Sequence, residues 1–177
     1  TFEADHIIGN YPLVYSSADA LILAEKSWDS WWFWNSDDSD EATNIHMFDI
    51  SDPGTTDYIA SGRVDGTIQD QFSLSEYQGV LRVASTEGQW GRWWLDNPEP
   101  MTSNVVTLQP ITDATGHTTL EQIGIIEGIA PNETIWSARF VEDKAYIVTF
   151  ENMDPLWTID LSNPATVSYT HLTLPTI

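Results

Sequence analysis

Two short segments concentrate the aromatic side chains that could bind a ligand. Residues 28–34 read WDSWWFW and residues 90–94 read WGRWW, so seven of the nine tryptophans lie in these two segments. Aromatic faces stack on sugars, cations and partner side chains, and clustered exposed aromatic residues commonly mark interaction sites. We therefore predict a ligand-binding surface that is made up of Trp31, Trp32, Trp34, Trp90, Arg92, Trp93 and Trp94.

The same rings could instead hold their own loops in place. A large aromatic ring buries about 150 to 250 Å² when it packs, which is enough to fix a long loop. In that arrangement Arg92 stacks on Trp93 or Trp94 and does not hold an anion. The sequence leaves both an exposed platform and a buried cluster open.

An acidic run directly follows the first aromatic segment. The stretch NSDDSDEATN, residues 35–44, places four carboxylates close together, on Asp37, Asp38, Asp40 and Glu41. Calcium takes roughly six to eight hard oxygen ligands, so this run is a candidate Ca²⁺ site. The spacing differs from the EF-hand pattern and lacks its glycine turn. The alternative is a solvated acidic loop, and no other cofactor is expected.

Catalytic motifs are scarce in this sequence. Outside the last eleven residues the histidines are His6, His46 and His117, and neither H-E-x-x-H nor G-x-S-x-G occurs. His46 lies in TNIHMFDIS, where a strand histidine is more often packed or half-exposed than catalytic. Among 27 acidic residues, paired carboxylates arise by chance, so no glycosidase pair can be nominated. The sequence favours a protein that is not an enzyme.

The charge balance narrows the range of partners. Only six Lys and Arg stand against 27 Asp and Glu, and the formal net charge is -21. Such a surface repels the phosphates of nucleic acids and of anionic lipids. Apolar runs such as LIL fall far below the roughly 18 residues that span a bilayer. We expect no nucleic-acid binding and no membrane insertion, and a protein or carbohydrate as partner.

Internal repeats indicate how the two aromatic segments are positioned. The segments ADALILAE (18–25), YQGVLRVAS (77–85) and EDKAYIVTF (142–150) each join a polar turn to an apolar strand. TNIHMFDISDP (43–53), SNVVTLQPIT (103–112) and DPLWTIDLSNP (154–164) form a second set. Ala20 and Val80 lie 60 residues apart, and so do Ile45 and Val105. These offsets predict a repeat of about 60 residues.

Each repeat reads as four short strands. β-Branched and aromatic runs are separated by Gly, Pro, Asp and Asn clusters, and in the second repeat the strands are expected near 71–76, 80–85, 103–109 and 120–126. Four antiparallel strands at this period are typical of a propeller blade. We predict an all-β, incomplete β-propeller of about two and a half blades over residues 1–166, with repeats at 11–66, 70–128 and 134–166.

The repeat brings the two aromatic segments together. Both lie between the second and third strands of their repeat, from Glu25 to Thr43 and from Ser85 to Ser103. Corresponding loops of successive blades emerge at the same rim. The two tryptophan-rich connections are therefore predicted to be neighbours.

The repeats also carry a family resemblance. TNIHMFDISDPGTTDYIASGRVDGTIQDQFSLSEYQGVLRVAST and, more specifically, SARFVEDKAYIVTFENMDPLWTIDLSNP resemble bacterial and archaeal secreted proteins with a C-terminal β-propeller distantly related to WD40 repeats. The resemblance implies a secreted or cell-envelope location and a propeller without an assigned activity. We expect a non-enzymatic interaction module, completed by the rest of the propeller in the parent chain. The alternative is part of a propeller hydrolase for polysaccharide or peptide, with catalytic residues elsewhere.

The last eleven residues read differently from the repeats. VSYTHLTLPT, residues 167–176, back-translates to a transposon-type DNA-sequencing adapter, and the codons of Thr166 and Ile177 fit the adapter's flanking bases. We expect residues 167–177 to be a non-native tail and the natural protein to be interrupted near Thr166.

Overall fold

The computed structural model describes residues 7, 11–27, 41–88, 100–150 and 156–171 of the 177-residue chain. These residues form β-strands and one short 3-10 helix, η2 (Gln71–Ser73). The all-β fold class is confirmed.

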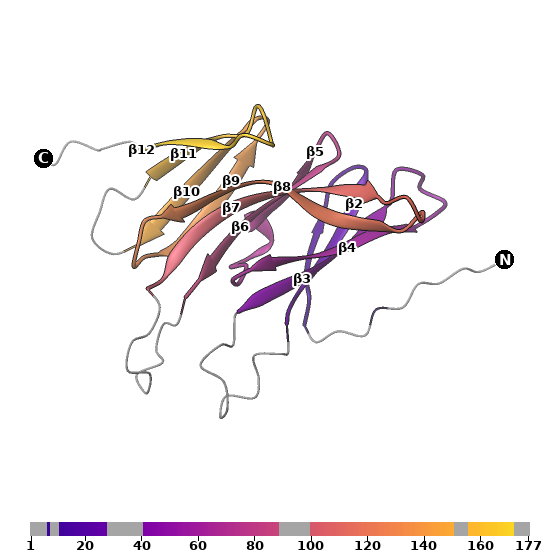
Figure 1. Ribbon diagram of the computed structural model, residues 1–177, viewed down its shortest axis with the longest axis horizontal. Coiled ribbons are helices and arrows are strands. Elements are labelled where there is room, and N and C mark those ends of the chain that lie inside the picture. Colours follow the sequence, from indigo (N-terminus) through magenta and orange to yellow (C-terminus); the bar gives the residue numbers. More distant parts are fainter. Residues whose placement is uncertain (1–6, 8–10, 28–40, 89–99, 151–155, 172–177) are drawn as a thin grey trace, which may run out of the picture.

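Each repeat folds as one four-stranded antiparallel sheet, and the three sheets lie side by side as blades (Figure 1). The first blade comprises β1 (Leu13–Ser16), β2 (Ala20–Lys26), β3 (Ala42–Asp49) and β4 (Asp57–Asp65). The second comprises β5 (Leu74–Tyr77), β6 (Val80–Glu87), β7 (Thr102–Thr112) and β8 (Thr118–Ile129). The third comprises β9 (Thr134–Val141), β10 (Lys144–Phe150), β11 (Leu156–Asp160) and β12 (Ser168–His171).

Within every blade each strand pairs with the next strand of the sequence. β4 and β8 also meet in parallel at Ser61 and Thr119, which joins the first two blades into one eight-stranded sheet. Gly62 allows this approach, because a Cβ at that position would lie 2.6 Å from both Cβ and the carbonyl oxygen of Leu120.

The hydrophobic core lies between the blades in two clusters. The first joins blades one and two, and it includes Ile22, Ile45, Leu81, Val83 and Leu108. The second joins blades two and three, and it includes Ala84, Val105, Ile147, Trp157 and Ile159. Each fully buried Ile or Leu side chain contributes about 1.5 to 3 kcal/mol relative to an exposed one. The blades are therefore held together mainly by their faces.

Burial along the strands follows from this stacking. In β2 of the first blade, buried residues alternate with half-buried ones, because one sheet face meets the second blade. In β6 of the middle blade, the five consecutive residues from Leu81 to Ser85 are all buried, because both faces are covered. A sheet with one face in solvent would instead show alternating buried and exposed residues.

The structure corrects one strand boundary and adds one strand. The first strand of the second repeat was expected near 71–76, but β5 begins at Leu74. Asp70 is the reason, because its side chain accepts hydrogen bonds from the amides of Phe72 at 2.9 Å and Ser73 at 3.2 Å. This capping turns residues 71–73 into η2. The third repeat gains a fourth strand, β12, which pairs with β11 inside the segment expected to be a tail. The non-native origin of residues 167–177 stays a prediction.

Candidate functional site

The strand ends that carry the two tryptophan-rich connections meet at one rim. The first connection leaves β2 at Lys26 and returns at Glu41, and the second leaves β6 at Glu87 and returns near Met101. All four residues line one pocket of about 250 Å³, which we call the loop-base pocket. The bases of the two connections therefore lie side by side, as the repeat predicts.

Main-chain hydrogen bonds join the first two blades beside this pocket. The amide of Gly66 donates to the carbonyl oxygen of Glu41 at 2.6 Å. Thr67 and Thr86 exchange two main-chain hydrogen bonds, of 2.8 and 3.0 Å. Gly66 has φ +83°, and a Cβ there would lie 2.5 Å from the carbonyl oxygen of Thr86, so the turn requires glycine. These bonds fix the distance between the two connections at their bases.

The start of the third blade closes the other side of the loop-base pocket. The amide of Asn132 donates to the carbonyl oxygen of Met101 at 2.7 Å. The amide of Ile135 donates to Oγ1 of Thr86 at 3.3 Å, and Ile135 is itself part of the pocket wall. Residues from all three blades therefore shape one small cavity.

The lining suits a ligand with many hydrogen-bonding groups. Its uncharged polar side chains are those of Thr67, Gln69, Thr86 and Thr134. Hydroxyl and amide groups both donate and accept hydrogen bonds, so they match sugar hydroxyls or peptide groups. The charged lining residues are Lys26, Glu41 and Glu87, a mixed set that does not favour an anion.

Most predicted binding residues lie outside the described residues. They are Trp31, Trp32, Trp34, Trp90, Arg92, Trp93 and Trp94 of the aromatic set, and Asp37, Asp38 and Asp40 of the acidic set. Glu41 is described, and it lines the loop-base pocket while its main chain is bonded to Gly66. The structure thus positions the strand ends from which these residues follow. Whether the rings form a platform or a packed cluster stays a prediction.

Comparison with known proteins identifies the family. A family model described as "Beta propeller domain" matches residues 1–170. The chain belongs to the β-propeller family. An uncharacterized protein of Methanocaldococcus jannaschii is 40% identical over 106 residues, which are 60% of this chain and 15% of that protein. An uncharacterized protein of Archaeoglobus fulgidus is 37% identical over 101 residues, which are 57% of this chain and 13% of that protein. The propeller chain thus spans a small part of the length of these relatives.

The first propeller blade carries a polar row that sequence reasoning missed. Tyr58 donates its hydroxyl hydrogen to Oγ of Ser61 at 2.8 Å, and Ser61 shares a hydrogen bond with Nδ1 of His46. Nε2 of His46 lies 3.8 Å from Oε1 of Glu25, too far for the hydrogen bond that orients a catalytic imidazole. As the structure stands, the row lacks the carboxylate–imidazole hydrogen bond of a catalytic triad. Cross-strand pairing of His46 with Ser61 is the signal that could have revealed it.

Two further findings concern the described part of the propeller. No three His, Cys, Asp or Glu side chains among the described residues come together to hold a metal ion. Three of the four predicted Ca²⁺ ligands fall outside that part, so the Ca²⁺ site stays a prediction. In the described segments, no helix has the length and apolar character to cross a bilayer.

Proposed function

We propose that this propeller is a non-enzymatic binding module of an exported or cell-envelope protein, and that its ligand binds over the loop-base pocket. One observation carries the proposal: the bases of both tryptophan-rich connections line the same pocket, at Lys26, Glu41, Glu87 and Met101. Aromatic rings that start from one rim can contact one ligand together. The resemblance to secreted propeller proteins supports the location.

The ligand class that fits best is an oligosaccharide segment of a surface polysaccharide. Sugar rings present apolar faces to aromatic side chains and hydroxyl groups to polar ones. The tryptophans would contact the apolar faces of the sugar rings, and Thr67, Gln69 and Thr134 would hydrogen-bond the sugar hydroxyls. A flat protein surface would make less use of a concave pocket of about 250 Å³.

The decisive experiment combines ligand binding with thermal unfolding. The folded chain is titrated with a panel of soluble polysaccharides by isothermal calorimetry. The variant with Trp31, Trp32, Trp93 and Trp94 all replaced by Ala is then tested in the same way. Tyr146→Ala is the matched control, because this exposed aromatic residue of β10 does not line the loop-base pocket. The proposal predicts that the fourfold variant loses binding while its Tm changes little, and that the control binds normally.

Two outcomes would contradict the proposal. Binding that survives in the fourfold variant would remove the tryptophans from the site. A large fall of Tm in that variant, with no wild-type binding to any polysaccharide, would show that the rings hold their own loops down.

A further inference from the structure

A second pocket lies where the first strands of the three blades converge. Its volume is about 350 Å³, and β1, the 71–75 segment and β9 all contribute to its wall. It shares no lining residue with the loop-base pocket. We call it the inner-strand pocket.

One arginine lines the inner-strand pocket directly. The guanidinium of Arg139 lies 4.0 Å from the centroid of the Phe72 ring and donates one hydrogen bond, of 2.7 Å, to the carbonyl oxygen of Ala138. Arg139 is exposed and Phe72 is 47% exposed. A guanidinium that is stacked on a ring is held in place, and its remaining N–H groups can still bind an acceptor.

A second arginine lies behind the wall. Arg82 is only 4% exposed and donates to Oγ of Ser75, which lines the pocket, at 2.6 Å. Its guanidinium also lies 5.2 Å from the ring centroid of Phe140, another lining residue. Its Nε is buried without a hydrogen-bond partner among the described residues. Burial lowers the pKa of Arg82, which means that its positive charge is poorly solvated there.

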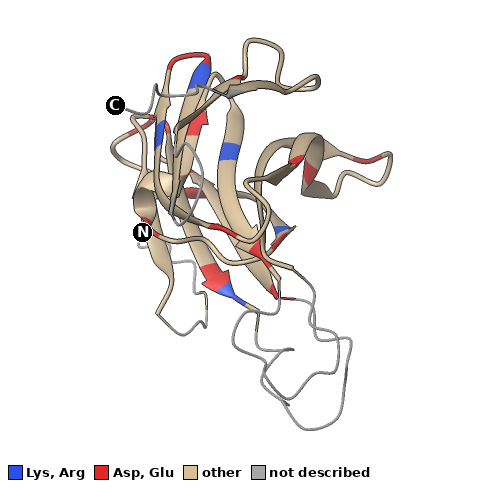
Figure 2. Cartoon of the chain, turned by 90° about the vertical axis from the view of Figure 1, so that its left-hand side faces the viewer, with Lys and Arg blue, Asp and Glu red and all other residues tan. Residues whose placement is uncertain are grey.

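Carboxylate partners of the two arginines were sought among the residues that the structure describes. Among the described residues, no Asp or Glu forms an ion pair with Arg82 or Arg139, although the chain has 27 acidic residues. The carboxylate of Glu76 favours the charged form of Arg82 and so partly offsets the lowering of the Arg82 pKa by burial. It accepts hydrogen bonds from the Ser17 hydroxyl and the Gly79 amide, both at 2.8 Å. Figure 2 shows how few Lys and Arg residues the fold carries. Two of the six positive side chains thus lie in or behind the wall of one pocket, and neither forms an ion pair with a described carboxylate.

We propose that the inner-strand pocket binds a carboxylate attached to an aromatic or apolar group. The carboxylate would accept hydrogen bonds from Arg139 and would gain from the charge of Arg82 behind the wall. The apolar group would pack against Val14, Phe72 and Phe140. A free aromatic carboxylic acid and the carboxyl end of a peptide share this chemistry.

The test uses two pairs of probes, and each pair is a carboxylate and its uncharged amide. The full chain is titrated by calorimetry with 3-phenylpropionate, with its amide, with a tetrapeptide ending in free Phe, and with the same tetrapeptide amidated. We expect the carboxylates to bind and the amides to bind at least about tenfold more weakly, because a charge-assisted hydrogen bond is lost. Binding of the peptide alone would identify a peptide end as the source, and binding of both acids would identify the free acid.

Variants then locate the site. Arg139→Gln should weaken binding of the carboxylate probes at least about tenfold. Phe72→Ala should weaken binding of the acid and of the amide alike, because the lost ring contacts the apolar group of both. Lys144→Gln is the control, since this exposed cation does not line the pocket. The fourfold tryptophan variant should bind normally, which separates this proposal from the proposed function. Absence of binding by both acids, equal binding of acid and amide, or wild-type affinity in Arg139→Gln would each overturn the proposal.

Discussion

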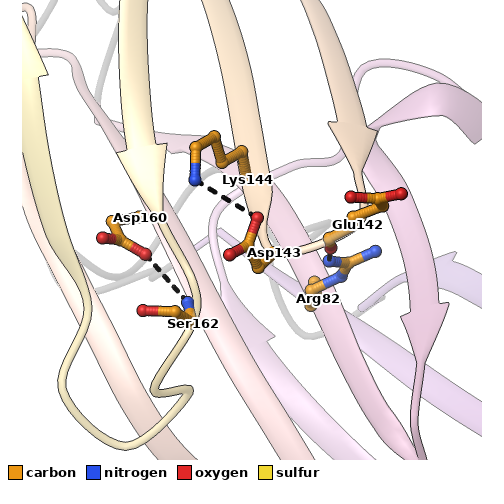
Figure 3. A network of polar contacts seen from close by, with 6 residues as sticks. All are labelled: Arg82, Glu142, Asp143, Lys144, Asp160 and Ser162. Atoms are coloured by element: carbon orange, nitrogen blue, oxygen red, sulfur yellow. Dashed lines mark hydrogen bonds and ion pairs between the residues drawn. The ribbon is translucent and has the colours of Figure 1, made fainter.

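Arg82 of the second blade donates a hydrogen bond from its guanidinium to the main-chain oxygen of Glu142 in the third blade (Figure 3). The two residues lie 60 positions apart, which is the length of the repeat. Glu76 and Ser17, which join the second blade to the first, lie 59 positions apart. Residues about one repeat apart in the sequence therefore contact each other across successive blades.

Arg82 should stabilise the joint between the second and third blades. Arg82→Ala removes the hydrogen bonds to Ser75 and Glu142 and the packing on Tyr77 and Phe140. We expect the free energy of unfolding to fall by about 2 to 4 kcal/mol, because buried hydrogen bonds to a charged group are lost together with side-chain volume. Urea denaturation followed by circular dichroism measures the change.

Lys144→Ala provides the control for Arg82→Ala. The ion pair between Lys144 and Asp143, at 3.2 Å, is exposed on both sides, so its loss should change the free energy of unfolding by less than about 0.5 kcal/mol. Equal effects of the two substitutions would contradict the role assigned to Arg82.

Gly62 should be intolerant of a side chain. Gly62→Ala places a Cβ against Leu120 where β4 meets β8, and we expect a loss of about 1 to 3 kcal/mol because one of the two blades must shift. Gly54→Ala is the matched control, since its Cβ would meet only the Asp52 side chain at 3.3 Å. Thermal unfolding compares the two variants. A Gly62→Ala protein as stable as Gly54→Ala would argue against the close contact of the blades.

Acidification should weaken the turns between the third and fourth strands of every blade. Asp49, Asp113 and Asp160 each accept hydrogen bonds from the residue two positions further on, and these bonds hold the pKa of each carboxyl below its usual value. A lowered folded-state pKa contributes stability above the unfolded-state pKa, and this contribution is lost as the pH falls through the folded-state pKa. The loss should therefore occur below about pH 4.

The measurement for these turns is Tm as a function of pH. The variant with all three aspartates replaced by Asn should lose less Tm than the wild type between about pH 5 and pH 2, because Asn does not titrate. Parallel curves for the two proteins would show that these carboxyl groups do not contribute to the acid sensitivity.

The outer face of the third blade should promote self-association. Val141 is 56% exposed and Tyr146 is 36% exposed, and the pairing of β9 with β10 places them on one face. Exposed apolar residues on a sheet favour aggregation. We expect the chain to associate, and Val141→Lys with Tyr146→Lys to shift it towards monomer in light scattering. A wild-type chain that stays monodisperse and melts cooperatively would disprove this.

Repeat spacing and strand patterns were sufficient to predict much of the fold. The strands expected near 80–85 and 103–109 are β6 and β7, because β-branched runs bounded by turn residues describe a strand locally. The 3-10 turn at residues 71–73 was missed because the side-chain capping by Asp70 outweighed strand propensity.

The side-chain contacts between blades could not be predicted from the sequence. The hydrogen bond from Arg82 to Glu142 and the wall of the inner-strand pocket depend on how one sheet is rotated against the next. No local pattern encodes that rotation. The loop-base pocket could be predicted in part, because the repeat indicates which connections share a rim. The contribution of Thr134 and Ile135 from the third blade could not be predicted.

The most direct test asks whether the bases of the two tryptophan-rich connections are neighbours. Thr67 and Thr86 form a hydrogen-bonded antiparallel pair beside the loop-base pocket, with Cα atoms expected about 5.5 Å apart, within the range for a disulfide. The chain has no cysteine, so Thr67→Cys with Thr86→Cys introduces a single possible bridge. Under mild oxidation the folded variant should form an intramolecular disulfide that peptide mass mapping detects. Two thiols that stay free, or that link only different molecules, would contradict the arrangement of the blades and the shared rim.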